Sequence, residues 1–198
     1  MAVSTEVTSP ARKVKHSGFI LDDPQIFFAA KGLHGVIAEK AIGKAVVYRR
    51  SKGVDDFVVR VSVATPMELV DAERQGVMGV FVKDMAKAMH IPAVRMFEIL
   101  GVPKATAEKK VAAGEVIKGG AGRAALGLAR LLGTAKSIVL NSTAPEAKTF
   151  DSAKWLGRWI ERPQPALGGR APADLIDTPT GVEVVARLLG SLESGAYQ

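Results

Sequence analysis

The stretch of sequence that decides the fold runs from Trp159 to Gly195 and reads WIERPQPALGGRAPADLIDTPTGVEVVARLLGSLESG. Four prolines and a Gly-Gly pair punctuate it, and its last part is an apolar segment. Proline fixes φ and glycine accepts positive φ, so these residues set sharp turns and give the apolar side chains between them defined directions. The stretch therefore predicts a rigid, turn-rich binding module that ends in a helix.

The closing helix is expected to begin near residues 178–181, where Thr180 and Glu183 stand at capping-box spacing. Its apolar residues surround the helix axis: Val182, Val184, Val185, Ala186, Leu188, Leu189 and Leu192. A surface helix needs only one apolar stripe, so the excess favours one face on the protein's own bundle and another on a partner. A helix buried in a single core explains the same pattern, and the sequence leaves both readings open.

From this module back to residue 65 the pattern stays helical. Thr65 and Glu68 form a capping box with Pro66 at the first helical position, which predicts a helix over 66–75 that Gly76 ends. Proline and glycine breaks delimit further helices near 81–90, 92–100, 103–113 and 120–140, and one after Pro145 that carries Trp155 and Trp159 on one side. The predicted fold class is therefore mainly α, a helical bundle.

The residues before 65 follow a different pattern. Residues 1–17 are polar and predict a mobile tail, and a short helix is expected near 24–31. Two runs rich in β-branched residues, 45–48 and 57–63, predict a short β-hairpin over 45–63. An isolated hairpin is marginally stable in water, so this one should pack on the helices or pair with a second copy.

Short helices joined by brief turns between residues 81 and 113 predict a helix-turn-helix. One register puts the turn at 90–92, exposes Arg95, and buries Met85, Ala86, Met89, Ile91, Met96 and Ile99. The other puts the turn at 101–103 and directs a basic helix outward, with Lys104, Thr106, Lys109 and Lys110. In either register the basic residues would neutralise DNA phosphates, while an ordinary helical bundle with solvated lysines is the plainer alternative.

The net charge of +7 is distributed unevenly along the chain. Residues 1–65 carry ten Lys/Arg against six Asp/Glu, residues 66–143 carry eleven against seven, and residues 144–198 carry six against seven. A basic front joined to a slightly acidic rear suggests two partners, of which the front could bind a polyanion such as DNA.

The sequence offers no convincing catalytic or metal site. The chain has no cysteine, and His16, His34 and His90 do not stand at metal-ligand spacing. The glycine-rich run 118–122 lacks the closing Gly-Lys-Ser/Thr of a phosphate loop. We therefore expect a protein that is not an enzyme and uses no metal or cofactor. No 18-residue apolar stretch and no secretory signal is present, which predicts a cytoplasmic protein with no membrane partner.

The C-terminal residues carry a family resemblance through their order, spacing and turn chemistry. They are Trp159-Ile160, Pro163-Gln164-Pro165-Ala166-Leu167-Gly168-Gly169, Pro172, Leu175-Ile176, Thr178, Gly181, Val185, Leu188-Leu189 and Gly195-Ala196-Tyr197. In this stretch the chain resembles the Xre/MbcA/ParS family of antitoxins, the partners of RES-domain toxins. A weaker likeness covers residues 66–143, where the family carries an atypical Xre-like helix-turn-helix and where Gly101–Thr106 and Lys109-Lys110 resemble its glycine-led run and basic pair.

The resemblance implies an antitoxin that silences a RES-type, NAD-degrading toxin by covering the active site with its C-terminal domain and extreme tail. The residues expected to contact the toxin are Trp159, Arg158, Arg162, Arg170, Leu188, Leu192, Gly195 and Tyr197. The resemblance also implies autoregulation of transcription, in which a homodimer, or a toxin–antitoxin hetero-oligomer, binds operator DNA. The residues expected to contact DNA are Arg95, Lys104, Thr106, Lys109 and Lys110.

The chain departs from the family pattern at three places. Gln164 stands where the family has Asn, Lys109-Lys110 replace an arginine pair, and residues 119–123 replace a polar Glu-Ser-x-Arg run. Lysine keeps the charge of arginine but loses its bidentate geometry. The last two departures bear on DNA affinity more than on toxin binding.

These patterns divide the chain into an N-terminal extension (1–64), a helix-turn-helix domain for DNA binding and dimerisation (65–143) and a small α-helical toxin-binding domain (144–198). Two alternatives remain at this stage. One is a stand-alone helix-turn-helix transcriptional regulator without a toxin, and the other is a protein-interaction module whose helix-turn-helix has decayed.

Overall fold

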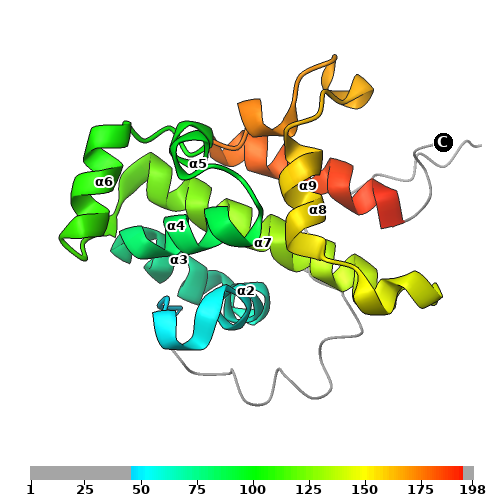
Figure 1. The fold of residues 1–198 in the computed structure, drawn as a ribbon, viewed down its shortest axis with the longest axis horizontal. Helices are drawn as coiled ribbons and strands as arrows, with labels where there is room; N and C mark the ends of the chain where they lie inside the picture. The colour runs from blue at the N-terminus through cyan, green and yellow to red at the C-terminus, as the bar shows by residue number, and fades with distance from the viewer. Residues whose placement is uncertain (1–45, 194–198) are drawn as a thin grey trace, which may run out of the picture.

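One long helix, α7 (Gly119–Asn141), runs through the middle of the molecule, and four other helices of the described part pack directly on it (Figure 1). The computed structural model describes residues 46–193. Glycine or alanine occupies seven of the eleven buried positions of α7. Small side chains let neighbouring helices approach closely, so one helix can serve as the centre for several others.

The elements around α7 are mostly short helices. The α-helices are α2 (Gly53–Val63), α3 (Pro66–Gln75), α4 (Gly79–Ala88), α5 (Ala93–Ile99), α6 (Lys104–Ala112), α8 (Ser152–Ile160) and α9 (Pro179–Glu193). Four 3-10 turns, η2 (Arg50–Lys52), η3 (Pro145–Thr149), η4 (Pro165–Leu167) and η5 (Pro172–Asp174), and two short strands, β1 (Val77–Met78) and β2 (Val116–Ile117), complete the described part. The predicted mainly α class is confirmed.

The start and end of α3 agree with the sequence prediction. The Thr65 hydroxyl accepts a hydrogen bond from the Glu68 amide, and the Glu68 carboxylate accepts one from the Thr65 amide. Gly76 ends the helix at φ 84°, a conformation that glycine adopts without strain. The capping box is therefore confirmed.

The β-hairpin predicted over 45–63 is wrong, because residues 53–63 form the helix α2. Two aspartates occupy its first turn, where the helix dipole favours negative charge. One of them, Asp56, pairs with Arg60 one turn later at 2.8 Å. The buried face of α2 consists of Phe57, Val58, Arg60 and Val61. Packing of this face against α7 and α4 overrides the strand propensity of the β-branched residues.

Two other N-terminal predictions, the polar tail over 1–17 and the helix near 24–31, lie outside the described residues.

The last helix, α9, begins within the predicted range 178–181, but two residues earlier than the Thr180–Glu183 capping box requires. Pro179 takes its first position, and the Thr178 hydroxyl accepts a hydrogen bond from the Gly181 amide at 3.1 Å. Val182, Val185, Leu188 and Leu189 are buried, whereas Glu183 and Arg187 are exposed. The structure thus favours a helix that is largely buried in the protein's own core, which was one of the two open readings.

A two-stranded ladder closes the unit formed by α4, α5 and α6. Strands β1 and β2 are antiparallel, with Val77 opposite Ile117 and Met78 opposite Val116. A Cβ atom on Gly76 or Gly122 would lie 2.5 or 2.6 Å from the Ile117 carbonyl oxygen. Side chains are therefore excluded at both positions. Because β1 precedes α4 and β2 follows α6, the chain enters and leaves the three-helix unit side by side.

Glycine also sets the distance between α8 and the three-helix unit. A Cβ atom on Gly157 would overlap the Met89 carbonyl oxygen, which belongs to rigid backbone. At Gly120, in the first turn of α7, an added Cβ meets nothing within 4 Å.

Gly157→Ala should lower the free energy of unfolding by about 1–3 kcal/mol, because α8 must move away from Met89. Gly120→Ala is the matched control and should leave stability unchanged or raise it by up to about 1 kcal/mol, through lost chain entropy in the unfolded state. Urea unfolding followed by circular dichroism measures both. Equal stability of the two variants would contradict the tight contact.

Candidate functional site

The helices α4, α5 and α6 form a compact three-helix unit in which α5, a four-residue connection and α6 have helix-turn-helix form. Gly101 lies in the connection with φ 66°. The apolar set that the first register assigned to the interior is buried throughout: Met85, Ala86, Met89, Ile91, Met96 and Ile99. Both predicted turns exist, since residues 90–92 join α4 to α5 and residues 101–103 lie between α5 and α6.

Helix α5 is tied to the C-terminal part of the chain. Arg95 donates to both carboxylate oxygens of Glu161, from Nε at 3.0 Å and from Nη2 at 3.1 Å, and also contacts Glu98 at 3.3 Å. Hydrogen bonding to Glu161 raises the pKa of Arg95. The guanidinium expected to contact DNA is thus engaged with two carboxylates within its own chain.

Helix α6 lies at one end of the molecule, away from α8 and α9 (Figure 1). Ala107 is fully buried and anchors it, whereas Lys104, Thr106 and Lys109 are exposed. Lys110 is half-buried and pairs with Glu115 at 3.3 Å, which explains how a lysine occupies an inward position. Four of the five expected DNA contacts therefore lie on α6, three of them exposed, while Lys110 and Arg95 take part in ion pairs.

The C-terminal part is built from α8, a projecting loop and α9. Asp151 caps α8 by accepting a hydrogen bond from the Lys154 amide at 2.9 Å. The rings of Trp155 and Trp159 stack with centroids 5.9 Å apart, and Phe150 lies 6.1 Å from Trp155. Helices α8 and α9 both pack on α7, so this part shares the core of the whole molecule.

Comparison with known proteins identifies this C-terminal part. Residues 147–195 match the family described as "Antitoxin Xre/MbcA/ParS C-terminal toxin-binding domain". The chain is also 34% identical over 149 residues to a protein of Sphingobium sp. (strain YBL2) named "Prs ADP-ribosylating antitoxin", a match that covers 75% of this chain and 92% of the relative. This chain belongs to the Xre/MbcA/ParS antitoxin family. Its partner is therefore a toxin protein.

Some of the residues expected to contact the toxin are instead buried inside the antitoxin itself. Trp159 is 9% exposed and Leu188 is 8% exposed, so both hold the domain together. Leu192 is half-buried against the core. Gly195 and Tyr197 lie outside the described residues.

The remaining expected contacts are arginines. Arg158, Arg162 and Arg170 are exposed, and their guanidinium groups form no ion pair with any other residue between 46 and 193. The sequence reasoning missed Phe150, which is 43% exposed beside Trp155 on the toxin-binding domain of the antitoxin. The four-residue spacing of Trp155 and Trp159 was the signal in the sequence for this row of three aromatic side chains, Phe150, Trp155 and Trp159.

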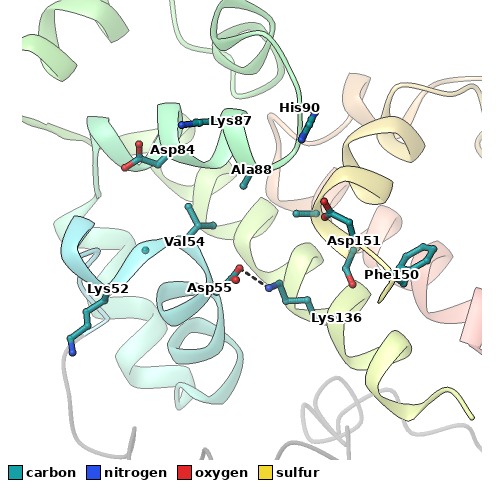
Figure 2. A pocket seen from close by; sticks show the side chains of 13 residues that line it. Lys52, Val54, Asp55, Asp84, Lys87, Ala88, His90, Lys136, Phe150 and Asp151 are labelled. Carbon is teal, nitrogen blue, oxygen red and sulfur yellow. Dashed lines mark hydrogen bonds and ion pairs between the residues drawn. The ribbon is translucent and has the colours of Figure 1, made fainter. Parts of the chain in front are cut away.

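A groove of about 640 Å³ lies where the toxin-binding domain meets the rest of the antitoxin (Figure 2). Asp55 and Lys136 form an ion pair in it at 2.6 Å, and Asp84 accepts a hydrogen bond from the Tyr48 hydroxyl at 2.7 Å. Burial raises the pKa of the Tyr48 hydroxyl, and the hydrogen bond to Asp84 raises it further. Among residues 46–193 no group of three or more His, Cys, Asp or Glu has the geometry to hold a metal ion.

None of the helices in the described part of the chain is long and apolar enough to cross a membrane.

The Arg95–Glu161 pair links two parts of the antitoxin but should contribute little stability, because about a third of each side chain is exposed to solvent. A double-mutant cycle with Arg95→Ala and Glu161→Ala should give a coupling energy of at most about 1 kcal/mol. Urea unfolding at low and high salt measures it, and the coupling should shrink with salt. A salt-independent coupling well above that value would show that the pair is desolvated.

Proposed function

We propose that this antitoxin neutralises a RES-type toxin that consumes NAD, and that it represses its own operon by binding operator DNA. The match of residues 147–195 to a toxin-binding domain carries the first half of the proposal. The name of the Sphingobium relative refers to ADP-ribosylation of Prs, a reaction that draws ADP-ribose from NAD and releases nicotinamide. The toxin of the present chain is proposed to use the same substrate.

In this proposal the antitoxin acts by stoichiometric binding and not by catalysis. The residues that follow α9 carry Gly195 and Tyr197, and we place them at the entrance of the toxin's active site, where they would exclude NAD. Tyrosine suits this role because it combines an apolar ring with a polar tip. Leu192, at the end of α9, would contact the toxin beside them.

The proposed DNA contact is α6, with Lys104, Thr106 and Lys109 facing the duplex. Two observations support this choice over α5: Arg95 is occupied by Glu161, and Gly157 of α8 presses on the connection before α5. In this proposal the lysines contact phosphates and orient the protein, and the exposed Thr106 would reach a base edge. A homodimer would present two copies of α6 to half-sites about one helical turn apart.

Deletion of residues 194–198 should abolish inhibition of the toxin while leaving the folded core intact. Purified RES toxin encoded beside the antitoxin gene is assayed for nicotinamide release from NAD, with full-length or shortened antitoxin. Tyr197→Ala should lose part of the inhibition, and Gln198→Ala, which alters only the last residue, is the control. Full inhibition by the shortened antitoxin would remove these residues from the mechanism. No release of nicotinamide by the toxin alone would disprove the NAD assignment.

Replacing Lys104 and Lys109 together by alanine should weaken binding to the DNA upstream of the antitoxin gene. Each phosphate contact contributes about 0.9 to the slope of log K against log salt, so the double variant should reduce the slope by about 2. Fluorescence anisotropy across a salt series measures the slope. The matched control, Lys148→Ala with Lys154→Ala, removes the same charge from the toxin-binding domain. An unchanged slope in the first pair would exclude α6 as the DNA contact.

A further inference from the structure

The loop between α8 and η5 projects from the bundle at the top of Figure 1, far from α6. We define the arginine loop as residues Arg162–Arg170. Seven of its nine residues are exposed, the exceptions being Gln164 and Leu167. Connections between helices usually need only a few residues, and longer ones with internal structure tend to be functional.

Hydrogen bonds within the arginine loop fix its shape. The Gln164 amide donates to the Arg170 carbonyl at 2.9 Å, and the Gly169 amide donates to the Gln164 carbonyl at 3.0 Å. The Gln164 side chain donates to the Arg162 carbonyl at 3.1 Å. Gly168 and Gly169 adopt φ of 65° and 81°, which close the turn. The loop is therefore preorganised, and the entropy cost of ordering it does not reduce the affinity for a partner.

The charges around the arginine loop are unbalanced. Arg162 and Arg170 stand at its two ends, and Arg158 precedes Arg162 by one helical turn. Glu161 is the only acidic residue from 158 to 173, and Arg95 binds both of its carboxylate oxygens. The next carboxylate, Asp174, accepts a hydrogen bond from the Ala171 amide. Three exposed guanidinium groups thus remain without a carboxylate among the described residues.

We infer that the arginine loop is a preformed docking element for a carboxylate-rich surface of the toxin, separate from the residues that cover the active site. Guanidinium groups bind carboxylates in bidentate geometry, which gives orientation as well as attraction. The matched toxin-binding domain contains the entire loop, which favours the toxin over DNA as its partner. This inference rests on the proposed function, because it requires the toxin as partner.

The test is the affinity of full-length antitoxin for the purified RES toxin, measured by isothermal titration calorimetry. Arg162→Glu with Arg170→Glu should lower the affinity by about tenfold or more, because like charges then face each other. The affinity of the unaltered chain should fall with added salt, and that of the variant should fall less. The matched control is Lys148→Glu with Arg187→Glu, two exposed cations of the same domain outside the loop, which should stay close to the unaltered chain.

A second pair of variants tests the shape of the loop without changing its charge. Gly168→Ala and Gly169→Ala each introduce a Cβ that meets nothing within 4 Å, so their effect is limited to the strain of positive φ. Each should lower toxin affinity by about fivefold. Far-ultraviolet circular dichroism should show native helix content in all these variants, because the loop lies outside the core.

Unchanged affinity in the charge-reversed loop variant would overturn the inference while leaving the proposed function intact, since the complex still forms. An equal loss in the control pair would also overturn it, because attraction would then be general to the domain. Loss of operator binding with unchanged toxin binding would assign the loop to DNA and overturn it as well. Failure of the unaltered chain to bind the toxin would overturn the proposed function, and the inference with it.

Discussion

The close approach of α2 and α9 to the backbone of α7 is the constraint on which the rest of the structure depends. A Cβ atom on Gly127 would collide with Val182 of α9, and one on Gly133 would collide with Ser62 of α2. The two glycines lie six residues apart and open different sides of α7 to its neighbours. The toxin-binding domain therefore packs on the same helix as the N-terminal helices, and the described residues share one core.

This shared core holds two surfaces at separate places on the molecule. Helix α6 lies at one end of the molecule, and the arginine loop stands out elsewhere (Figure 1). Between them, Gly157 packs closely against Met89 and Arg95 binds Glu161. Helix α5 and the connection before it are therefore in contact with the toxin-binding domain. In the proposed function, DNA and toxin contact separate residues, and neither has to displace the other.

The fold could be predicted from the sequence wherever a signal is local. The Thr65–Glu68 capping box, its proline and the closing Gly76 fix α3 by contacts within a few residues. The strand prediction for residues 57–63 failed because the contacts that decide their structure are with residues far away in the sequence. Alternation suggested a strand with Phe57, Val59 and Val61 on one side, but the buried face of α2, which packs against α7 and α4, holds Phe57, Val58 and Val61.

The candidate site shows the same limit. An apolar side chain in a binding domain can face its own core or a partner, and the sequence does not distinguish them, so Trp159 and Leu188 were expected at an interface and are buried. The availability of Arg95 depends on Glu161, a residue 66 positions away. By contrast, Lys104, Thr106 and Lys109 are exposed as the second register predicts, while Ala107 of the same short helix, α6, is buried and Lys110 is half-buried.

Net charge illustrates why position matters more than composition. Residues 144–198 carry six Lys/Arg against seven Asp/Glu, a balance that predicts no attraction for an acidic partner. Several of those carboxylates have local tasks: Asp151 caps α8, Asp174 binds the Ala171 amide, and Glu161 binds Arg95. Interactions between exposed charges are screened beyond about 8 Å at physiological salt. A partner bound at the arginine loop therefore interacts with the loop's arginines and not with the net charge of the domain. A slightly acidic domain can therefore present a basic docking surface.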